Sequence, residues 1–277
     1  MEALTGMLHK LPGNLPAEVR NTVKSYDDYV HMQCDALNAE EGRLTGYDCQ
    51  ECRNKGFVYG VNNGELVSRR CRCAPIRESL SVMESSGLGS ALQDCTFDRY
   101  TVAEDWQKEL RDDVRRFADA KDGSWLLVCG QVGCGKTHLC TAAVGEFIRA
   151  GYSARYMLWR DEAVQLKACV NDDEAYYRRM FPLKTVDVLY IDDFFKTATG
   201  KGPTAGDVNL AFEIINSRYA DRSKITILSC ELYVDDIIAI DEAVGSRIYQ
   251  RTKPYCLAVG RDQAKNYRLR REKEDKP

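Results

Sequence analysis

A glycine-rich segment in the middle of the chain has the residue types and spacing of a phosphate-binding loop. Gly130-Gln-Val-Gly-Cys-Gly-Lys-Thr137 fits the pattern G-x-x-x-x-G-K-[ST], which needs a strand before it and a helix after it. The apolar run Trp125–Cys129 precedes it, and a helix-favouring segment begins at His138. Glycines let backbone N–H groups turn inward around an anion, and the helix N-terminus adds its positive end. The segment therefore predicts ATP binding.

Individual side chains of the phosphate-binding loop are expected to play different parts in nucleotide binding. Lys136 would reach the β- and γ-phosphates, and the Thr137 hydroxyl would ligate Mg²⁺. Cys134 is expected to be a passive spacer. The residues expected to contact the nucleotide are Gly130, Val132, Gly133, Cys134, Gly135, Lys136, Thr137 and His138.

A pair of aspartates follows another buried strand. The run Asp187–Ile191 leads directly into Asp192 and Asp193, and the carboxyl ends of parallel strands form the ligand-binding edge of an α/β sheet. Asp192 is expected to hold Mg²⁺, and Asp193 to orient or activate the attacking water. The alternative is that the pair caps a helix, a role that Asp favours.

Polar residues further along complete the candidate catalytic set. The strand Ile225–Ser229 would place Ser229 or Glu231 near the γ-phosphate. Arg247 and Arg251 are four residues apart and share one face of a helix. One of them would stabilise charge on a neighbouring subunit's phosphate during transfer. The alternative is that both are surface arginines paired with carboxylates.

Four of the twelve cysteines have the spacing of zinc ligands. Cys49 and Cys52 form C-x₂-C, Cys71 and Cys73 form C-x-C, and two such pairs complete a tetrahedron around Zn²⁺. The segment between them predicts a short hairpin with an Asn63-Gly64 turn. So small a module needs the metal to be stable, and four thiolates leave no open position, so the zinc is expected to be structural. The alternative is four unconnected thiols. The cysteines outside this cluster and the phosphate loop are expected to be buried apolar fillers; they are Cys34, Cys95, Cys129, Cys140, Cys169, Cys230 and Cys256.

Apolar runs alternate with helix-favouring segments from Trp125 onward. This alternation predicts an α/β fold whose parallel sheet is covered on both faces. The segment Thr197–Gly206 is expected to be a loop. The expected strands are Trp125–Cys129, Arg155–Leu158, Asp187–Ile191, Ile225–Ser229 and Tyr255–Val259, and the expected helices cover about 136–150, 161–169, 206–220 and 235–250.

Composition divides the chain into three expected parts: a helical region at 1–45, a zinc-binding module at 46–78 and an ATPase domain at 79–277. The net charge of −3 means that nucleic-acid binding would need a local basic patch. Phe57 and Tyr59 accompany the first of two basic clusters, a combination that suits single-stranded DNA or a protein partner; the alternative is a solvated face or tail. The clusters are Arg69, Arg70, Arg72 and Arg77, and Arg261, Lys265, Arg268, Arg270, Arg271 and Lys273.

No apolar run approaches the roughly 20 residues that a membrane-spanning helix needs. The first residues lack a basic start followed by an apolar block, so they do not fit a secretory signal. We therefore expect a cytoplasmic protein without membrane contact.

The order of these motifs resembles one family. The phosphate loop, the YIDD segment ending at Asp193, the helix segment Ile214–Tyr219, LSCEL and the GSRI segment around Arg247 are similar to AAA+ ATPases of the DnaC/DnaI helicase-loader group, especially their phage and prophage relatives, and to the related IstB proteins. The resemblance covers roughly residues 95–270. It implies five parallel core strands, a homo-oligomer with ATP at the subunit interfaces, Arg247 or Arg251 acting in trans, and Ser229–Glu231 as the sensor segment, where many relatives have Asn.

The resemblance also implies a function. The chain would bind single-stranded DNA, hydrolyse ATP and load a hexameric replicative helicase onto DNA, with its N-terminal region contacting the helicase. One alternative is an IstB-like transposition helper that coats duplex DNA. Another is a nucleotide-sensing scaffold with little turnover, which Asp193 in place of the more usual Glu permits.

Overall fold

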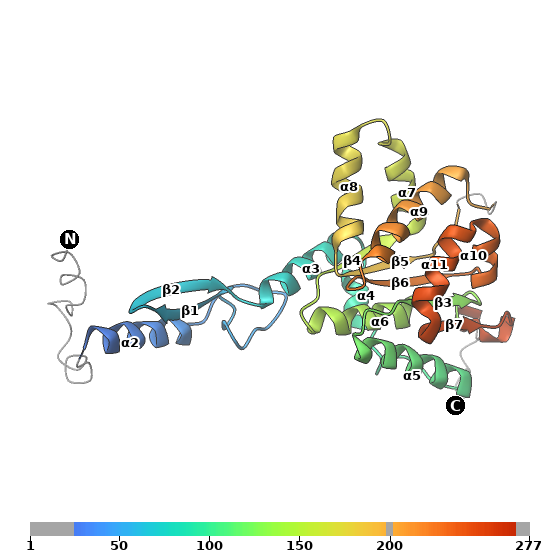
Figure 1. Cartoon of the computed structure of the whole chain (residues 1–277). Coiled ribbons are helices and arrows are strands. Elements are labelled where there is room, and N and C mark those ends of the chain that lie inside the picture. Colours follow the sequence, from blue (N-terminus) through green and yellow to red (C-terminus); the bar gives the residue numbers. More distant parts are fainter. Residues whose placement is uncertain (1–24, 198–201, 270–277) are drawn as a thin grey trace, which may run out of the picture. The chain divides into compact units, whose positions relative to one another are not determined.

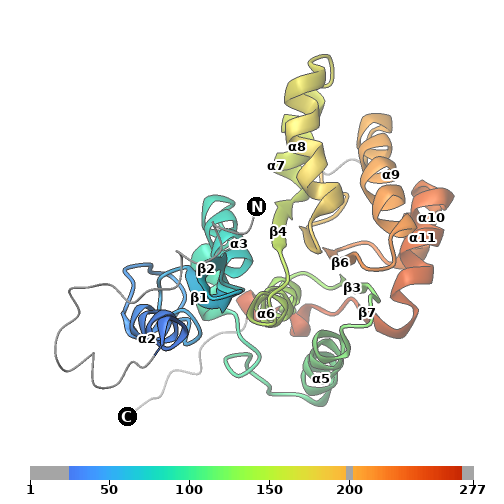
Figure 2. The same ribbon diagram turned by 60° about the vertical axis from the view of Figure 1, so that its left-hand side comes forward.

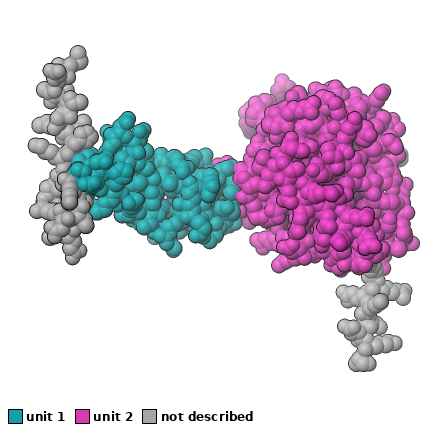
Figure 3. All heavy atoms as spheres, turned by 60° about the horizontal axis from the view of Figure 1, so that its bottom comes forward, with its two compact units in different colours: residues 1–77 teal, residues 78–277 magenta. Residues whose placement is uncertain are grey.

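The chain forms two compact units that divide between Arg77 and Glu78 (Figure 3). The structure is a computed structural model and describes residues 25–197 and 202–269. The first 24 residues of the helical region expected at 1–45 lie outside these residues. The finer division predicted from the sequence, with boundaries after residues 45 and 78, stays a prediction.

The first unit contains one helix, a hairpin and the start of a second helix among its described residues. Asn63 and Gly64 both have positive φ angles, 52° and 75°, as a two-residue hairpin turn of the mirror-image type requires. The predicted Asn-Gly hairpin is therefore confirmed. The elements are α2 (Tyr26–Ala39), β1 (Phe57–Asn62), β2 (Glu65–Arg70) and α3 (Cys73–Ser85), which continues into the second unit.

Two side chains join α2 to the hairpin region. The Asn38 amide nitrogen donates to the carbonyl of Tyr59 and its oxygen accepts from the Tyr59 N–H, both at 3.0 Å. The Lys55 ammonium donates to three carbonyls at the end of the helix, those of Leu37, Asn38 and Glu40. A helix end leaves such carbonyls without partners, so Lys55 caps α2.

The second unit is built on a parallel sheet of five strands in the order β4-β5-β6-β3-β7 (Figure 1). The predicted five-stranded parallel sheet is confirmed, and each predicted strand agrees with the observed one to within a residue at either end. The strands are β3 (Leu126–Gly130), β4 (Ala154–Leu158), β5 (Val188–Asp192), β6 (Ile225–Cys230) and β7 (Cys256–Val259).

Helices cover both faces of this sheet (Figure 2). One face packs against α6, which α5 covers in turn, and the other packs against the helices from α7 to α11. The helices are α4 (Gly89–Asp94), α5 (Asp105–Ala120), α6 (Lys136–Arg149), α7 (Trp159–Ala168), α8 (Asp173–Thr185), α9 (Ala205–Ala220), α10 (Val234–Ile240) and α11 (Glu242–Thr252), with short 3₁₀ turns η1 (Lys253–Tyr255), η2 (Gln263–Lys265) and η3 (Tyr267–Leu269).

The helix predicted over 235–250 is in fact two helices. Asp241 has an extended backbone and accepts a hydrogen bond from the Val244 N–H at 2.8 Å. Its carboxylate therefore caps the start of α11 at the residue where α10 ends. A capping aspartate inside a helical pattern marks a boundary that apolar periodicity alone does not locate.

The sequence reasoning missed α8 altogether. Only Met180 and Leu183 of this helix are buried, so its apolar periodicity is weak. Asp172 starts the helix by accepting from the Ala175 N–H at 3.0 Å. The predicted loop at 197–206 is also too long, because α9 begins at Ala205; residues 198–201 lie outside the described part.

None of the described helices has the length and apolar character that crossing a bilayer requires.

Candidate nucleotide site and cysteine cluster

The loop between β3 and α6 needs glycine at the positions where its backbone turns. Gly130 and Gly135 have φ angles of 103° and 94°, in the region that residues with a Cβ rarely adopt. A Cβ at Gly130 would lie 2.0 Å from the Val259 carbonyl oxygen, and one at Gly135 would lie 2.6 Å from the Tyr100 ring. The neighbouring segments thus pack closely against the loop, whose backbone conformation fits a phosphate cradle.

The ammonium of Lys136 lies against this loop. It donates to the carbonyls of Gly130 at 3.0 Å and Gln131 at 2.7 Å, and the side chain is buried. Lys136 is also the first residue of α6, so a positive side chain and a helix N-terminus meet at one point. This arrangement fits a polyphosphate.

Asp192 ends β5 and is the acceptor of four hydrogen bonds. Its carboxylate accepts from the Thr137 hydroxyl at 3.3 Å, the Tyr156 hydroxyl at 3.2 Å, the Asp193 N–H at 3.1 Å and the Ser229 hydroxyl. Burial and the negative charge of Asp192 raise the pKa of Tyr156 well above its ordinary value, so the phenol stays a donor. Thr137 and Asp192, the two expected Mg²⁺ ligands, therefore lie side by side, and their oxygen donors suit that ion.

A turn rather than a helix follows Asp192, so the aspartate pair does not cap a helix. Asp193 and Phe195 have positive φ angles of 53° and 61°, which are uncommon for residues other than glycine. The buried rings of Phe194 and Phe195 stack on each other and contact Trp159 edge-on. This aromatic packing anchors the turn beside the phosphate loop.

The turn places Lys196 next to Asp193; this lysine was not among the residues predicted from the sequence. Its ammonium lies 3.1 Å from the Asp193 carboxylate and 2.8 Å from that of Glu231, which follows β6. Burial alone would lower the pKa of Lys196, but the hydrogen bonds to these two carboxylates raise it above its ordinary value. Lys196 is therefore a permanent positive charge between two acids.

A cavity of about 430 Å³ opens beside these residues. All the predicted nucleotide contacts except Gly130 and Ser229 line it. Ser229 is buried outside the cavity lining, and its hydroxyl donates to the Asp192 carboxylate. The lining residues are Arg99, Tyr100, Thr101, Gln107, Val132, Gly133, Cys134, Gly135, Lys136, Thr137, His138, Asp193, Lys196, Glu231, Lys265, Tyr267 and Arg268.

The segment after β7 contributes to the cavity in a way that the sequence did not indicate. The Tyr267 N–H donates to the Gly133 carbonyl at 2.9 Å, and the Asp262 N–H donates to the side chain of Gln131 at 2.9 Å. These bonds fasten the segment to the phosphate loop and place Lys265 and Arg268 in the cavity wall. In the sequence both residues belong to a basic cluster, and no motif spacing links them to the loop.

The two arginines of α11 have different surroundings. Arg251 is 4% exposed, and its terminal nitrogens donate to the carbonyls of Tyr219, Asp221, Gly123, Arg222 and Lys224. Arg247 is only half-buried, lies over the rings of Phe212 and Tyr219, and donates to the Ala243 carbonyl at 2.7 Å. Neither arginine lines the cavity. Arg251 is thus committed to its own chain, whereas Arg247 lies nearer the surface.

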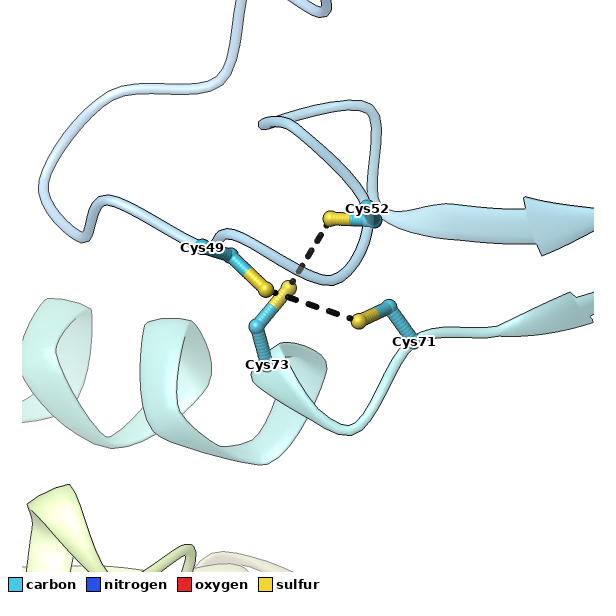
Figure 4. Close-up of side chains that lie close together, drawn as sticks. All are labelled: Cys49, Cys52, Cys71 and Cys73. Carbon is cyan, nitrogen blue, oxygen red and sulfur yellow. Dashed lines mark hydrogen bonds between the residues drawn. The ribbon is translucent and has the colours of Figure 1, made fainter. Parts of the chain in front are cut away.

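The four predicted zinc ligands of the first unit lie together (Figure 4). The Sγ atoms of Cys49 and Cys71 are 3.7 Å apart, those of Cys52 and Cys73 are 3.6 Å apart, and all four lie within 4.8 Å of one another. Zinc–sulfur bonds of about 2.3 Å in a regular tetrahedron place sulfurs about 3.8 Å apart. The alternative of four unconnected thiols is therefore wrong, and both the donor set and the spacing fit Zn²⁺.

The backbone around this cluster is held by polar side chains. The Gly56 N–H donates to the Cys52 sulfur at 3.3 Å, as expected around a thiolate ligand. Arg77 donates to the carbonyls of Thr45 and Tyr47 and to the side chain of Asn54. Arg77 of the first basic cluster therefore supports the cysteine loop, in contrast to the exposed Arg69 and Arg72, which pair with Glu51.

Most of the other cysteines are buried fillers, as predicted. Burial raises the pKa of the Cys129 thiol to about 12, so this thiol stays protonated. Cys95, Cys169 and Cys256 are only partly buried, and for these three the prediction is wrong in degree; the buried ones are Cys34, Cys129, Cys140 and Cys230.

A phosphate loop after β3, an acidic pair at the end of β5 and the strand order β4-β5-β6-β3-β7 define an ATP-binding unit of the AAA+ class. Residues 62–275 match the family model described as IstB-like ATP binding protein. The chain belongs to this family.

Three known proteins illustrate the relationship. The PBSX phage-like element protein XkdC of Bacillus subtilis (strain 168) is 31% identical over 242 residues, which are 83% of this chain and 89% of that protein. The DnaC helicase loader, known from a crystal structure, has 19% sequence identity to this chain and a TM-score of 0.50. The match covers 61% of this chain and 97% of that one. DnaA from Aquifex aeolicus, bound to AMPPCP, is 22% identical, with a TM-score of 0.48, over 60% of this chain and only 49% of that one. The two structural likenesses concern the fold.

Proposed function

We propose that the chain is an ATPase that loads a hexameric replicative helicase onto DNA. The observation that carries the ATPase part is the convergence of Lys136, Thr137, Asp192 and Asp193 at one place beside the cavity. A phosphate cradle, a pair of Mg²⁺ ligands and a water-orienting carboxylate are the parts that phosphoryl transfer to water requires.

The proposed roles follow from these positions. Lys136 holds the β- and γ-phosphates, and Asp193 orients the attacking water. Thr137 and Asp192 hold Mg²⁺, which neutralises phosphate charge when bound. Ser229 holds the Asp192 carboxylate by its hydrogen bond.

The remaining part of the site comes from a second copy of the chain. We assign the finger role to Arg247, because Arg251 already donates to five backbone carbonyls. This assignment implies a homo-oligomer with ATP at each subunit interface.

The loader part rests on family and fold. The fold is shared with a helicase loader, and the relative XkdC belongs to a phage-like element, a setting in which replication genes of a phage are expected. The first unit, with its four-cysteine cluster, is the proposed helicase contact, and the oligomer would grip single-stranded DNA.

Phosphate release by the full-length chain, with and without single-stranded DNA, tests hydrolysis. Nucleotide binding without release would instead indicate a nucleotide-sensing scaffold. Co-purification with a hexameric replicative helicase tests loading. A variant lacking residues 1–77 is expected to lose the helicase and keep ATP binding; capture of the helicase by that variant would contradict the assigned contact.

A second candidate is an IstB-like transposition helper, which the family match favours. Such a protein would assemble on duplex DNA in the presence of ATP and without any helicase. Electron microscopy of the chain on duplex and on single-stranded DNA separates the two functions, because only the helper is expected to form filaments on the duplex.

A further inference from the structure

We propose that Lys196 is a positioning residue of the hydrolytic site, which holds the carboxylates of Asp193 and Glu231 together in the cavity wall. The inference rests on the proposed function, because it assigns Lys196 a part in ATP hydrolysis. It identifies a residue outside the phosphate loop and the aspartate pair on which turnover depends.

The two carboxylates come from neighbouring strands of the sheet. Asp193 directly follows β5 and Glu231 directly follows β6, and these strands pair in parallel. Two negative charges at adjacent strand ends repel each other unless a cation lies between them. The Lys196 ammonium lies 3.1 Å from the first and 2.8 Å from the second, so it links both.

The local backbone is shaped to return Lys196 to this position. The Lys196 N–H donates to the Asp193 carbonyl at 2.9 Å, and the Phe194 N–H donates to the Ser229 carbonyl at 2.9 Å. The positive φ angles of Asp193 and Phe195 close the turn. Uncommon backbone conformations of this kind persist where the surrounding packing fixes them and often accompany functional sites, and here the two buried phenylalanine rings supply that packing.

A purely stabilising role accounts poorly for this lysine. The side chains of Lys196, Asp193 and Glu231 are 43%, 33% and 40% exposed, and ion pairs with that much exposure contribute little to folding. All three line the same cavity as Lys136 and Thr137. Lys196 thus fixes the direction of Asp193, the residue proposed to orient water, beside Asp192 and in the wall of the cavity that Thr137 also lines.

The experiment compares Lys196→Met with Lys196→Arg in the full-length chain. Misplacing a water-orienting group by about 1 Å costs on the order of 100-fold in rate, so Lys196→Met is expected to lower kcat by about 10- to 100-fold. Its Kd for a fluorescent ADP analogue is expected to stay within about twofold of wild type, because the phosphate loop is untouched. Lys196→Arg keeps the charge between the acids and is expected to recover most of kcat.

Lys224→Met is the matched control. Lys224 pairs with Asp187 at 3.0 Å, and these residues precede β6 and β5, at the opposite ends of the same two strands. This variant removes a lysine–aspartate pair whose residues do not line the cavity, and it is expected to leave kcat unchanged. A Glu231→Gln variant provides a second route: it is expected to lower kcat, and its combination with Lys196→Met to cost less than the product of the single effects.

The outcomes separate the inference from the function on which it rests. Wild-type turnover with a Lys196→Met kcat within twofold of wild type would overturn the inference alone. A parallel fall of kcat and ADP affinity would also overturn it, since that indicates a disturbed phosphate loop. A wild-type chain that binds ATP and releases no phosphate would overturn both.

Discussion

The hydroxyl of Thr137 donates a hydrogen bond to Oδ1 of Asp192 across 3.3 Å. This contact joins the first turn of α6 to the end of β5, two strands away from β3 in the sheet. The Ser229 and Tyr156 hydroxyls hold the same carboxylate from β6 and β4. The oxygens assigned to Mg²⁺ are therefore fixed by the fold itself.

Replacing Asp192 by Asn tests this assignment. The substitution keeps the shape and removes the negative charge, so Mg²⁺-dependent phosphate release is expected to fall by about 100-fold or more, as when one group stabilising a transition state is lost. Tyr156→Phe is the control, because it removes one hydrogen bond to the same carboxylate and leaves the negative charge of that carboxylate. Its phosphate release is expected to fall much less than that of the Asn variant. Phosphate release by the Asn variant at the wild-type rate would remove Asp192 from the site.

Arg247 and Arg251 are expected to differ sharply in their effects. Arg247→Ala is expected to lower turnover by about 10³-fold, the lower limit for an arginine finger, with little change in thermal stability. Mixing Arg247→Ala chains with Lys136→Ala chains should restore activity. At some interfaces the first variant then supplies an intact phosphate loop and the second supplies Arg247. A mixture no more active than its components would show that Arg247 does not act across an interface.

Arg251→Ala is expected to act on stability instead. It removes the Arg251 donors from the part-buried carbonyls of Tyr219 and Gly123, and each unsatisfied group costs about 1–3 kcal/mol. The free energy of unfolding, measured in urea, is expected to drop by at least about 2 kcal/mol. A variant as stable as wild type but catalytically dead would return the finger role to Arg251.

The contrast between these arginines marks the limit of sequence reasoning. A four-residue spacing shows that Arg247 and Arg251 share a helix face, but not that loops around Gly123 and Lys224 cover the end of that face. The phosphate loop and the four cysteines were predictable because a fixed chemistry imposes a fixed spacing. Lys196 was not, because a left-handed turn after Asp193 brings it back and no residue pattern signals that turn.

The positions of Lys265 and Arg268 in the cavity wall could not be predicted from the sequence either, since they depend on how the segment after β7 folds onto Gly133.

Replacing both Lys265 and Arg268 by Ala is expected to weaken ATP binding by about 10-fold, because each cation in the cavity wall contributes up to about 1 kcal/mol to holding phosphates. Titration with a fluorescent ATP analogue measures this. Arg261→Ala is the control, because Arg261 lies over the Tyr233 ring and does not line the cavity; equal affinities of the two variants would contradict the prediction.

Asp207 couples the stability of α9 to pH. Burial alone would raise the pKa of Asp207, but hydrogen bonds from Lys167 and Thr204 lower it below its ordinary value. A lowered pKa gives stability that is present above the unfolded-state value, about 4, and that is lost as the pH falls through the folded-state value. Asp207→Asn is expected to cost about 1–2 kcal/mol at neutral pH, and the difference should shrink below about pH 4.

Urea unfolding of wild type and Asp207→Asn, from neutral pH down to about pH 3, measures this difference in the free energy of unfolding. Asp173→Asn, at an exposed position in the first turn of α8, serves as the control and is expected to change little. A difference between wild type and Asp207→Asn that stays constant down to pH 3 would assign the cost to packing instead of charge.

We predict that the four-cysteine cluster holds zinc and that removal of this metal unfolds the first unit selectively. Structural zinc supplies roughly 10–16 kcal/mol of apparent binding free energy at neutral pH, more than a hairpin and one helix gain by burying apolar surface. Cys52→Ser should therefore lose zinc, measured by mass spectrometry of the native chain, and become sensitive to protease before residue 78, while nucleotide binding persists. Cys34→Ser is the control, because it alters a buried thiol of the same unit outside the cluster; this variant should keep both its zinc and its resistance to protease. Zinc retention by Cys52→Ser would rule out the four-thiolate site.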